Sequence, residues 1–378
     1  MTQHCPGEVA AHDRVLAVLE VTASNTRHTT SDPVLDHVVA ELEDRRRAVH
    51  VWRAEVPDRA PGTWLPALAE SIRGNLRTSD DGVPSSVHAF GWRAALGLAA
   101  ASSPDAPALV AHLGDGPGVA GRDDLAAHKL ERLMWASART VDAVVLDSEW
   151  AINRAAACGV PRSQLVRGLP VVTSPDADVP WSIRDGGRSP RLVAVGGVGP
   201  TAGTDTILDA VARIPDVELV VAAPSDAPDS RLLKARRWLR RRGNGAADRV
   251  RLERFSRGLL EDCDVVMDAG AGAGCADGVV RAMAHRRAVI ASDVGPRAEA
   301  VVAGTTGELV APGDPRRWRD RILQLLQDPF RLEAYGDAGY ERSRVGFAPA
   351  RRAELMLHLD ERLAKARPTR LERALDAA

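Results

Sequence analysis

The stretch from Ala282 to Pro315 decides the fold and reads AMAHRRAVIASDVGPRAEAVVAGTTGELVAPGDP. Its apolar run Val289 to Ala291 is short, rich in β-branched residues and bounded by turn formers, which predicts a buried strand. Pro312-Gly313-Asp314 predicts a turn, and Pro315 suits the first turn of a helix. Glycines that allow tight turns punctuate the stretch at Gly295, Gly304 and Gly307. Each glycine alone indicates only a turn, whereas the ordered set indicates a strand-turn-helix unit.

The same alternation of apolar strands and amphipathic helices extends along most of the chain. In the first half, the strand-like runs are Val15 to Val21, Ala48 to Val56, Ser86 to Phe90, Ala108 to Leu113 and Ala143 to Leu146. In the second half, they are Leu192 to Val195, Val217 to Ala222, Val250 to Phe255, Val265 to Met267 and Val289 to Ala291. This pattern predicts an α/β fold with two Rossmann-like, doubly wound parallel sheets. Such sheets bind ligands at the carboxyl ends of their strands, so two facing halves predict a cleft between them.

The alternation breaks between Ser174 and Pro190, in the sequence SPDADVPWSIRDGGRSP. Pro, Gly, Asp and Ser dominate this stretch, as is typical of a linker. We therefore predict an N-terminal domain at residues 1–175, a linker at 176–190 and a C-terminal domain at 191–345. Residues 346–378 are predicted to be helical.

Composition limits the class of protein. Of the 378 residues, 45% are hydrophobic and 27% charged, and the net charge is −1. These values are typical of a globular protein and give no electrostatic reason to expect a nucleic-acid partner. The four cysteines are far apart and form no C-x-x-C pair, which argues against a metal site and favours a reducing cytoplasm. No signal peptide and no transmembrane segment is predicted.

The stretch from Asp264 to Pro315 resembles the donor-domain signature of the retaining GT-B glycosyltransferases of family four, the glycosyl transferases group 1. The matching motifs are Ala282-Met283-Ala284, Ser292-Asp293-Val294-Gly295, Glu299, the Thr306-Gly307 pair and Pro312-Gly313-Asp314-Pro315. The resemblance implies a GT-B fold whose last helices cross back to the N-terminal domain. It also implies transfer of a hexosyl group from a nucleoside diphosphate sugar to an acceptor, with retention and without a metal or cofactor.

The resemblance fails at positions that carry charge in the family. Ala273 and Arg281 stand where family members have two glutamates, one contacting the transferred sugar and one the ribose. A guanidinium group only donates hydrogen bonds, so Arg281 cannot accept them from a ribose diol. Gly197 and Ala202 replace the arginine and lysine that neutralise the diphosphate. The chain is therefore predicted to be a divergent member with a degenerate donor site.

Candidate donor-binding residues follow from this alignment. The backbone amides of Gly274 and Cys275, at a helix start, are candidates to hold one phosphate. Arg254 ends a strand and is the candidate substitute cation, although a solvated surface arginine is the simpler interpretation. Arg281 is interpreted either as a relocated contact or as the partner of Asp277 at i,i+4. The remaining donor-side candidates are Gly196, Gly197 and Glu299, the last expected to open a short helix from Glu299 to Val302 at the cleft.

Acceptor-side candidates come from the first half. Family members place a histidine after the strand that ends near Asp115, and the alignment puts Gly114 there, with His112 two residues earlier. His112 and Asp115 are therefore both candidates. Trp92 follows a strand within HAFGW, which predicts a ring at the carboxyl edge of the sheet, facing the cleft. Most tryptophans instead pack in the core.

Two functions stay open at this point. One is an active glycosyltransferase with relocated phosphate contacts. The other is a catalytically inactive homologue that acts as a partner subunit, stabilising an active glycosyltransferase. Separately, the basic segment from Arg231 to Arg242 is typical either of a membrane-surface helix or of a solvated helix. We expect the second, with Leu232, Leu233 and Leu239 packed on the sheet.

Overall fold

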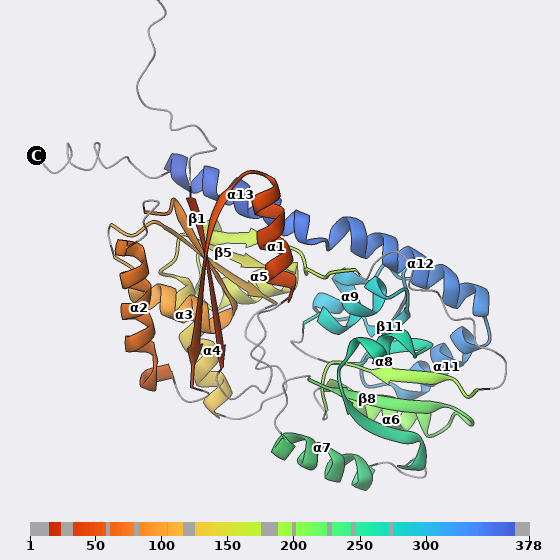
Figure 1. The fold of residues 1–378 in the computed structure, drawn as a ribbon. Helices are drawn as coiled ribbons and strands as arrows, with labels where there is room; N and C mark the ends of the chain where they lie inside the picture. The colour runs from red at the N-terminus through yellow and green to blue at the C-terminus, as the bar shows by residue number, and fades with distance from the viewer. Residues whose placement is uncertain are drawn as a thin grey trace, which may run out of the picture.

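The computed structural model describes residues 15–23, 33–57, 61–78, 83–103, 105–115, 125–174, 188–198, 202–224, 229–242, 247–271 and 275–366. Within these ranges the chain forms two six-stranded sheets, one in each half, and the strand pairs in both are parallel. Figure 1 shows the two halves side by side, the first in red to yellow and the second in green to cyan. The predicted α/β class with two doubly wound parallel sheets is confirmed.

The N-terminal sheet has the strand order β2-β1-β3-β4-β5-β6. Its strands are β1 (Val15–Ala23), β2 (Ala48–Val56), β3 (Ser86–Phe90), β4 (Ala108–Gly114), β5 (Ala143–Leu146) and β6 (Leu165–Arg167). The helices between them are α1 (Pro33–Asp44), α2 (Leu65–Thr78), α3 (Gly91–Ala101), α4 (Leu125–Ala138) and α5 (Glu149–Ala157). Side chains alternate across β1, as strand geometry requires. Ala17 and Leu19 join the core formed with α2 to α5, whereas Leu16 and Val18 pack on the opposite face with α1.

The C-terminal sheet has the order β12-β11-β10-β7-β8-β9. Its strands are β7 (Arg191–Ala194), β8 (Glu218–Ala223), β9 (Val250–Arg254), β10 (Val265–Asp268), β11 (Ala288–Ser292) and β12 (Glu308–Val310). Its helices are α6 (Thr204–Val211), α7 (Asp229–Arg242), α8 (Arg257–Glu261), α9 (Asp277–Ala284), α10 (Pro296–Ala300), α11 (Pro315–Leu326) and α12 (Pro329–Gly346). One face packs on α6 and α11, and the other on α8 and α9.

The last helix, α13 (Pro349–Ala366), packs on the N-terminal sheet although it follows the C-terminal one. Ala353 and Met356 join Leu16, Val18 and Leu42 in one apolar cluster. Figure 1 shows α12 and α13 in blue, running from the C-terminal half across to the N-terminal half. The predicted domain boundaries stay a prediction, since most of the linker lies outside the described residues. None of the helices within the described ranges is long and apolar enough to cross a membrane.

One predicted element is wrong. The short helix expected from Glu299 to Val302 is α10, which begins at Pro296 and ends at Ala300. Gly295 precedes it with a φ of 65°, and Pro296 occupies the first turn, where a missing N–H costs no hydrogen bond. Glu299 therefore lies inside this helix rather than at its start.

Candidate functional site

The residues that follow β4 and β5 meet the start of α9 at the interface between the two halves. The contact is direct, because the Asp115 Oδ2 atom accepts a hydrogen bond of 3.2 Å from the Ala276 backbone N–H, just before α9. The Ser148 hydroxyl also donates to Asp115. The other oxygen, Oδ1, is buried and has no hydrogen-bond partner within the described ranges. Asp115 thus connects the two halves through one carboxylate oxygen, while its other oxygen accepts no hydrogen bond from the described residues.

Burial raises the pKa of Asp115 to about 6. The hydrogen bonds from Ser148 and Ala276 oppose this shift, while the charges of Asp147 and Asp277 add to it. A carboxyl group whose pKa lies close to neutral exchanges protons readily at working pH, which is a common property of functional carboxyls.

Asp268 and Arg297 form a fully buried ion pair at the carboxyl end of β10. The side chains are 1% and 3% exposed, and Arg297 Nε lies 2.6 Å from Asp268 Oδ1. That oxygen also accepts from the Gly270 N–H at 3.1 Å. Burial raises the pKa of Asp268, and Arg297 opposes the shift. As in Asp115, one oxygen, here Oδ2, is buried without a hydrogen-bond partner in the described structure.

Two glycines make room for this pair. A Cβ atom at Gly196 would lie 2.8 Å from Asp268 Oδ1, and one at Gly270 would meet the Arg297 guanidinium. Gly196 and Gly197 also have φ values of 91° and 106°, which favour glycine. The end of β7 is therefore fitted closely to Asp268. Sequence analysis missed Asp268 and Arg297, although a charged residue ending the apolar run VVMD is a signal of a site at a strand end.

Cys275 lies near both carboxyl groups. Desolvation by the surrounding chain, followed by the charges of Asp277, Asp115 and Asp268, raises the pKa of its thiol to about 12. The Asp277 backbone N–H donates to its sulphur. Two amides at the start of α9, those of Ala276 and Asp277, thus already have partners in the chain itself. Gly274, the other predicted phosphate contact, lies outside the described residues.

Glu299 binds the start of a helix in the other half. Its carboxylate accepts from the backbone N–H groups of Glu149 and Trp150, at 2.8 and 2.9 Å, and lies 2.7 Å from Arg167. Ser148 caps the same helix, α5, by accepting from the Ala151 N–H. The expectation that a carboxylate suits a positive helix end therefore applies to α5 rather than to a helix opened by Glu299.

His112, on β4, belongs to a buried network between the N-terminal sheet and α13. Arg352 donates to His112 Nδ1 at 3.0 Å, so His112 Nε2 carries the proton and donates to His88 Nδ1 at 2.8 Å. His88 in turn contacts Ser86, whose hydroxyl donates to Asp360 on α13. Burial lowers the pKa of both histidines, that of His88 to about 4, so both are neutral. His112 also stacks on Phe90. The network ties α13 to the sheet.

Three further candidates have local partners. Arg254 lies at the end of β9, an edge strand, and pairs with Asp229. Arg281 lies 3.9 Å from Asp277, the i,i+4 pairing that was its simpler interpretation. Trp92 is half-buried, lies at the carboxyl end of β3 as expected, and packs against Trp64 with ring centroids 6.3 Å apart. The structure thus brings together Asp115, Gly196, Cys275 and the neighbourhood of Glu299, but not Arg254 or Trp92. His112 is connected to this region through Arg352, which contacts both His112 and Asp147.

Comparison with known proteins finds a family match within the C-terminal half. Residues 189–328 match the model of the glycosyl transferases group 1. The lipopolysaccharide core biosynthesis mannosyltransferase LpcC of Rhizobium leguminosarum is 39% identical over 74 residues, 20% of this chain and 21% of that protein. The alpha-maltose-1-phosphate synthase of Mycobacterium tuberculosis is 40% identical over 86 residues, 21% of this chain and 22% of that protein. The matches thus span about a fifth of each curated relative.

Solved structures match over nearly the whole chain and show the fold. Sucrose-phosphate synthase from Thermosynechococcus elongatus has a TM-score of 0.74 at 18% identity, covering 94% of this chain and 100% of that one. Anabaena HepE, in complex with UDP and glucose, has a TM-score of 0.67 at 16% identity, covering 91% and 98%. Residues 189–328 are thus similar to the glycosyl transferases group 1, and the two halves of the chain together have the GT-B glycosyltransferase fold.

Proposed function

We propose that the protein transfers a hexosyl group from a nucleoside diphosphate sugar to an acceptor, with retention, at the interface between its two halves. One observation carries this proposal: Asp115 Oδ1 and Asp268 Oδ2 are buried carboxylate oxygens without hydrogen-bond partners in the described structure. They belong to opposite halves and both influence Cys275. Sugar hydroxyls donate hydrogen bonds, which is what a buried carboxylate oxygen lacks.

The two carboxyl groups take different roles in this proposal. Asp268 follows β10 beside Gly196 and Gly197, so its Oδ2 accepts from a hydroxyl of the donor sugar. Asp115 follows β4 in the other half, so its Oδ1 accepts from the acceptor hydroxyl. HepE, whose fold is similar, was solved with UDP and glucose, which supports a nucleotide sugar as the donor class.

Donor affinity is expected to be weak. Gly197, Ala202 and Arg281 replace two cations and a carboxylate of the family, and each lost charge-assisted contact costs about 1.5–3 kcal/mol. The amides of Ala276 and Asp277 are used by Asp115 and Cys275. The cation beside the candidate donor site is Arg297, held by Asp268, whereas Arg254 pairs with Asp229 at the sheet edge. If a phosphate contact is relocated, Arg297 is therefore a better candidate than Arg254.

The second function, an inactive partner subunit, also has an observation in its favour. Asp115 and Glu299 each bind the helix start of the opposite half, so the chain's own carboxylates close the interface. A protein kept for its shape rather than for turnover would retain such contacts and lose the donor contacts. An active glycosyltransferase subunit would then be its partner.

Two measurements distinguish the active enzyme from the inactive partner subunit: calorimetry with a panel of nucleotide sugars, and an assay of released nucleoside diphosphate. The proposed enzyme binds one donor with a dissociation constant in the ~millimolar range, after losing about three charged contacts at roughly tenfold or more each, and releases the diphosphate slowly. Absence of binding and release for every sugar would favour the inactive partner. A micromolar constant would instead show relocated contacts, and Arg297→Lys and Arg254→Ala would then identify the cation.

A further inference from the structure

Helix α7 lies on the outside of the C-terminal half, beside the edge strand β9 (Figure 1). Its inward side is apolar: Leu239 is 7% exposed and joins the core, and Trp238 is half-buried against it. Leu233, expected to pack on the sheet, is instead 53% exposed, so that part of the prediction is wrong. A single exposed leucine is ordinary at a protein surface, so the charges around Leu233 decide what this face can bind.

The exposed part of α7 is strongly basic. Its cations, all exposed, are Lys234, Arg236, Arg237, Arg240 and Arg241. At about 100° per residue, the five fall on both sides of Leu233. Lys234, Arg237 and Arg241 lie opposite Leu239, whereas Arg236 and Arg240 lie nearer to Leu239, on the side of β9. None of the five forms an ion pair within the described ranges, whereas the carboxylate at the start of the helix, Asp229, pairs with Arg254. We call these five cations and Leu233 the basic face.

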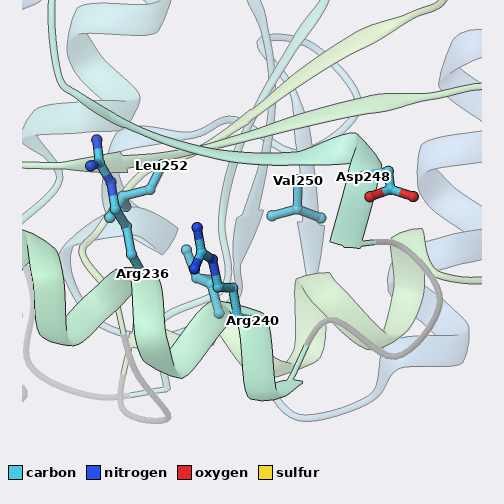
Figure 2. A pocket seen from close by; sticks show the side chains of 6 residues that line it. Arg236, Arg240, Asp248, Val250 and Leu252 are labelled. Carbon is cyan, nitrogen blue, oxygen red and sulfur yellow. The ribbon is translucent and has the colours of Figure 1, made fainter.

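A groove of about 380 Å³ borders this face, between α7 and β9. Figure 2 shows Arg236 and Arg240 extending from α7 on the side of β9, near Val250 and Leu252. Leu239 completes the apolar lining, and Asp248 is the one acidic residue among the described residues that line the groove. Guanidinium groups over an apolar floor match the boundary between phosphate headgroups and acyl chains.

We propose that the basic face of α7 docks the protein onto a membrane surface rich in anionic phospholipids. The five cations meet the headgroup phosphates, and Leu233 inserts below them. The whole chain carries a net charge of −1, so this cluster is local and orients the protein. A nucleic acid fits less well, because the centre of the face is aliphatic rather than an aromatic platform for bases. This inference does not depend on the proposed reaction.

Vesicle co-sedimentation of the full chain tests the proposal. Each basic residue near an anionic surface contributes about fivefold in partition. We expect binding to phosphatidylglycerol-containing vesicles at least tenfold above binding to pure phosphatidylcholine, with loss at high salt. The variant Arg237→Glu/Arg241→Glu should bind at least 25-fold more weakly. Leu233→Ser should weaken binding a few-fold at low salt.

The matched control is Arg132→Glu/Arg362→Glu, which makes the same charge change at exposed positions of α4 and α13. It should keep vesicle binding within twofold, and thermal unfolding confirms that each variant is folded. Equal binding to both vesicle types, or an unchanged Arg237→Glu/Arg241→Glu variant, would overturn the proposal. So would displacement by millimolar glycerol phosphate, which would indicate a site for free phosphate, or tighter binding to single-stranded RNA than to vesicles.

Discussion

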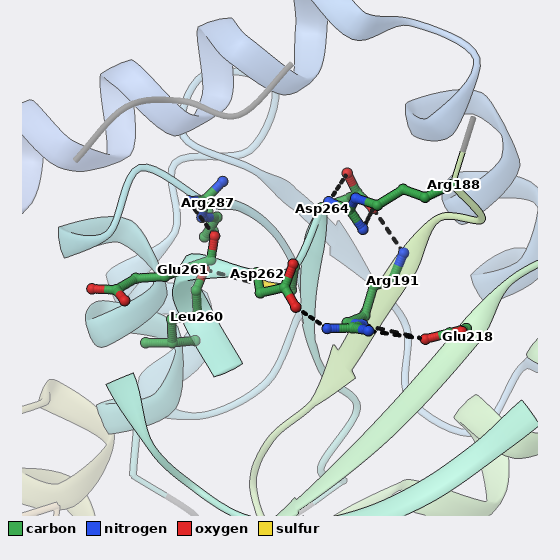
Figure 3. A network of polar contacts seen from close by, with 9 residues as sticks. Arg188, Arg191, Glu218, Leu260, Glu261, Asp262, Asp264 and Arg287 are labelled. Atoms are coloured by element: carbon green, nitrogen blue, oxygen red, sulfur yellow. Dashed lines mark hydrogen bonds and ion pairs between the residues drawn. The ribbon is translucent and has the colours of Figure 1, made fainter. Parts of the chain in front are cut away.

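Asp264 and Asp268 stand at the two ends of the same strand, β10, and their surroundings differ. Asp264, at the amino end, accepts from the Arg191 backbone N–H and pairs with Arg188. Figure 3 shows it within a network that also joins Arg191 to Glu218 and Asp262. Asp268, at the carboxyl end, has Arg297 and one backbone N–H but keeps Oδ2 unpartnered.

The comparison indicates that the amino end of the sheet stabilises the fold, whereas the carboxyl end keeps a polar group available to a ligand. At the amino end, side chains complete the sheet's own hydrogen bonds and use the carboxylate fully. At the carboxyl end, a buried oxygen without a partner costs free energy that folding alone does not explain. The parallel sheet rule, that ligands bind at the carboxyl ends, agrees with this contrast.

The largest effect is expected at the buried pair. Arg297→Met leaves the Asp268 charge buried and uncompensated, so the free energy of unfolding at neutral pH should fall by about 3–5 kcal/mol. The double variant Asp268→Leu/Arg297→Met removes both charges and should recover stability to within about 1 kcal/mol of the wild type. Urea unfolding measures both. If Arg297→Met lowered the free energy of unfolding by less than about 1 kcal/mol, the claim that Arg297 compensates a buried Asp268 charge would be contradicted.

A smaller effect is expected at the other end of β10. Asp264→Asn keeps an acceptor for the Arg191 N–H but loses the charge beside Arg188, so unfolding should become easier by about 1–2 kcal/mol. Donor binding should not change, because the residue lies at the far end of the strand. Calorimetric titration with the best donor checks this, and weaker binding would remove the distinction between the two ends.

Asp115 gives a pH-dependent effect. Its folded-state pKa of about 6 lies above its usual value of 3.8, so the protein binds this proton more tightly when folded. The charged form therefore costs stability above pH 6, and the cost disappears as pH falls below about 4. Asp115→Asn should raise the free energy of unfolding by about 1–2 kcal/mol at pH 8, less than the full shift implies because the residue as a whole is only half-buried. The free energies of unfolding of the wild type and of Asp115→Asn should differ at pH 8 and become equal at pH 4. The same difference at both pH values would refute the shifted pKa.

The smallest effect is expected for Arg254→Ala. Arg254 is on the edge strand and pairs with an exposed carboxylate, Asp229, a kind of pair that contributes about 0–1 kcal/mol. Donor affinity should change by less than about twofold. A tenfold loss would place the donor phosphates at β9 and would move the candidate site away from β10.

Much of the fold could be predicted because it depends on local patterns. Ala48–Val56, Ser86–Phe90 and Ala143–Leu146 are strands with the predicted bounds, since apolar runs between turn formers specify them. The helix that ends in Ala300 was misplaced because the first-turn role of Pro296 was missed. Pro315, by contrast, does occupy the first turn of α11.

The candidate site depends on contacts that no local pattern encodes. Asp115 meets Ala276 across 161 residues, and Glu299 meets Glu149 across 150. Asp268 and Arg297 are 29 positions apart, on different elements, and only the packed sheet brings them together. Family motifs located the neighbourhood of these residues, but the missing charges at Ala273 and Arg281 gave no sign of where other charges lie.

The most direct test of the proposed function compares nucleoside diphosphate release by the wild type and by Asp268→Leu/Arg297→Met, with the nucleotide sugar that the wild type binds best. The double variant is the informative one, because its stability should match the wild type while the unpartnered oxygen is gone. We predict slow release by the wild type and at least a 100-fold lower rate in the double variant. Equal rates in the two proteins, or no release by the wild type with any sugar, would contradict a glycosyl-transfer site at the carboxyl end of β10.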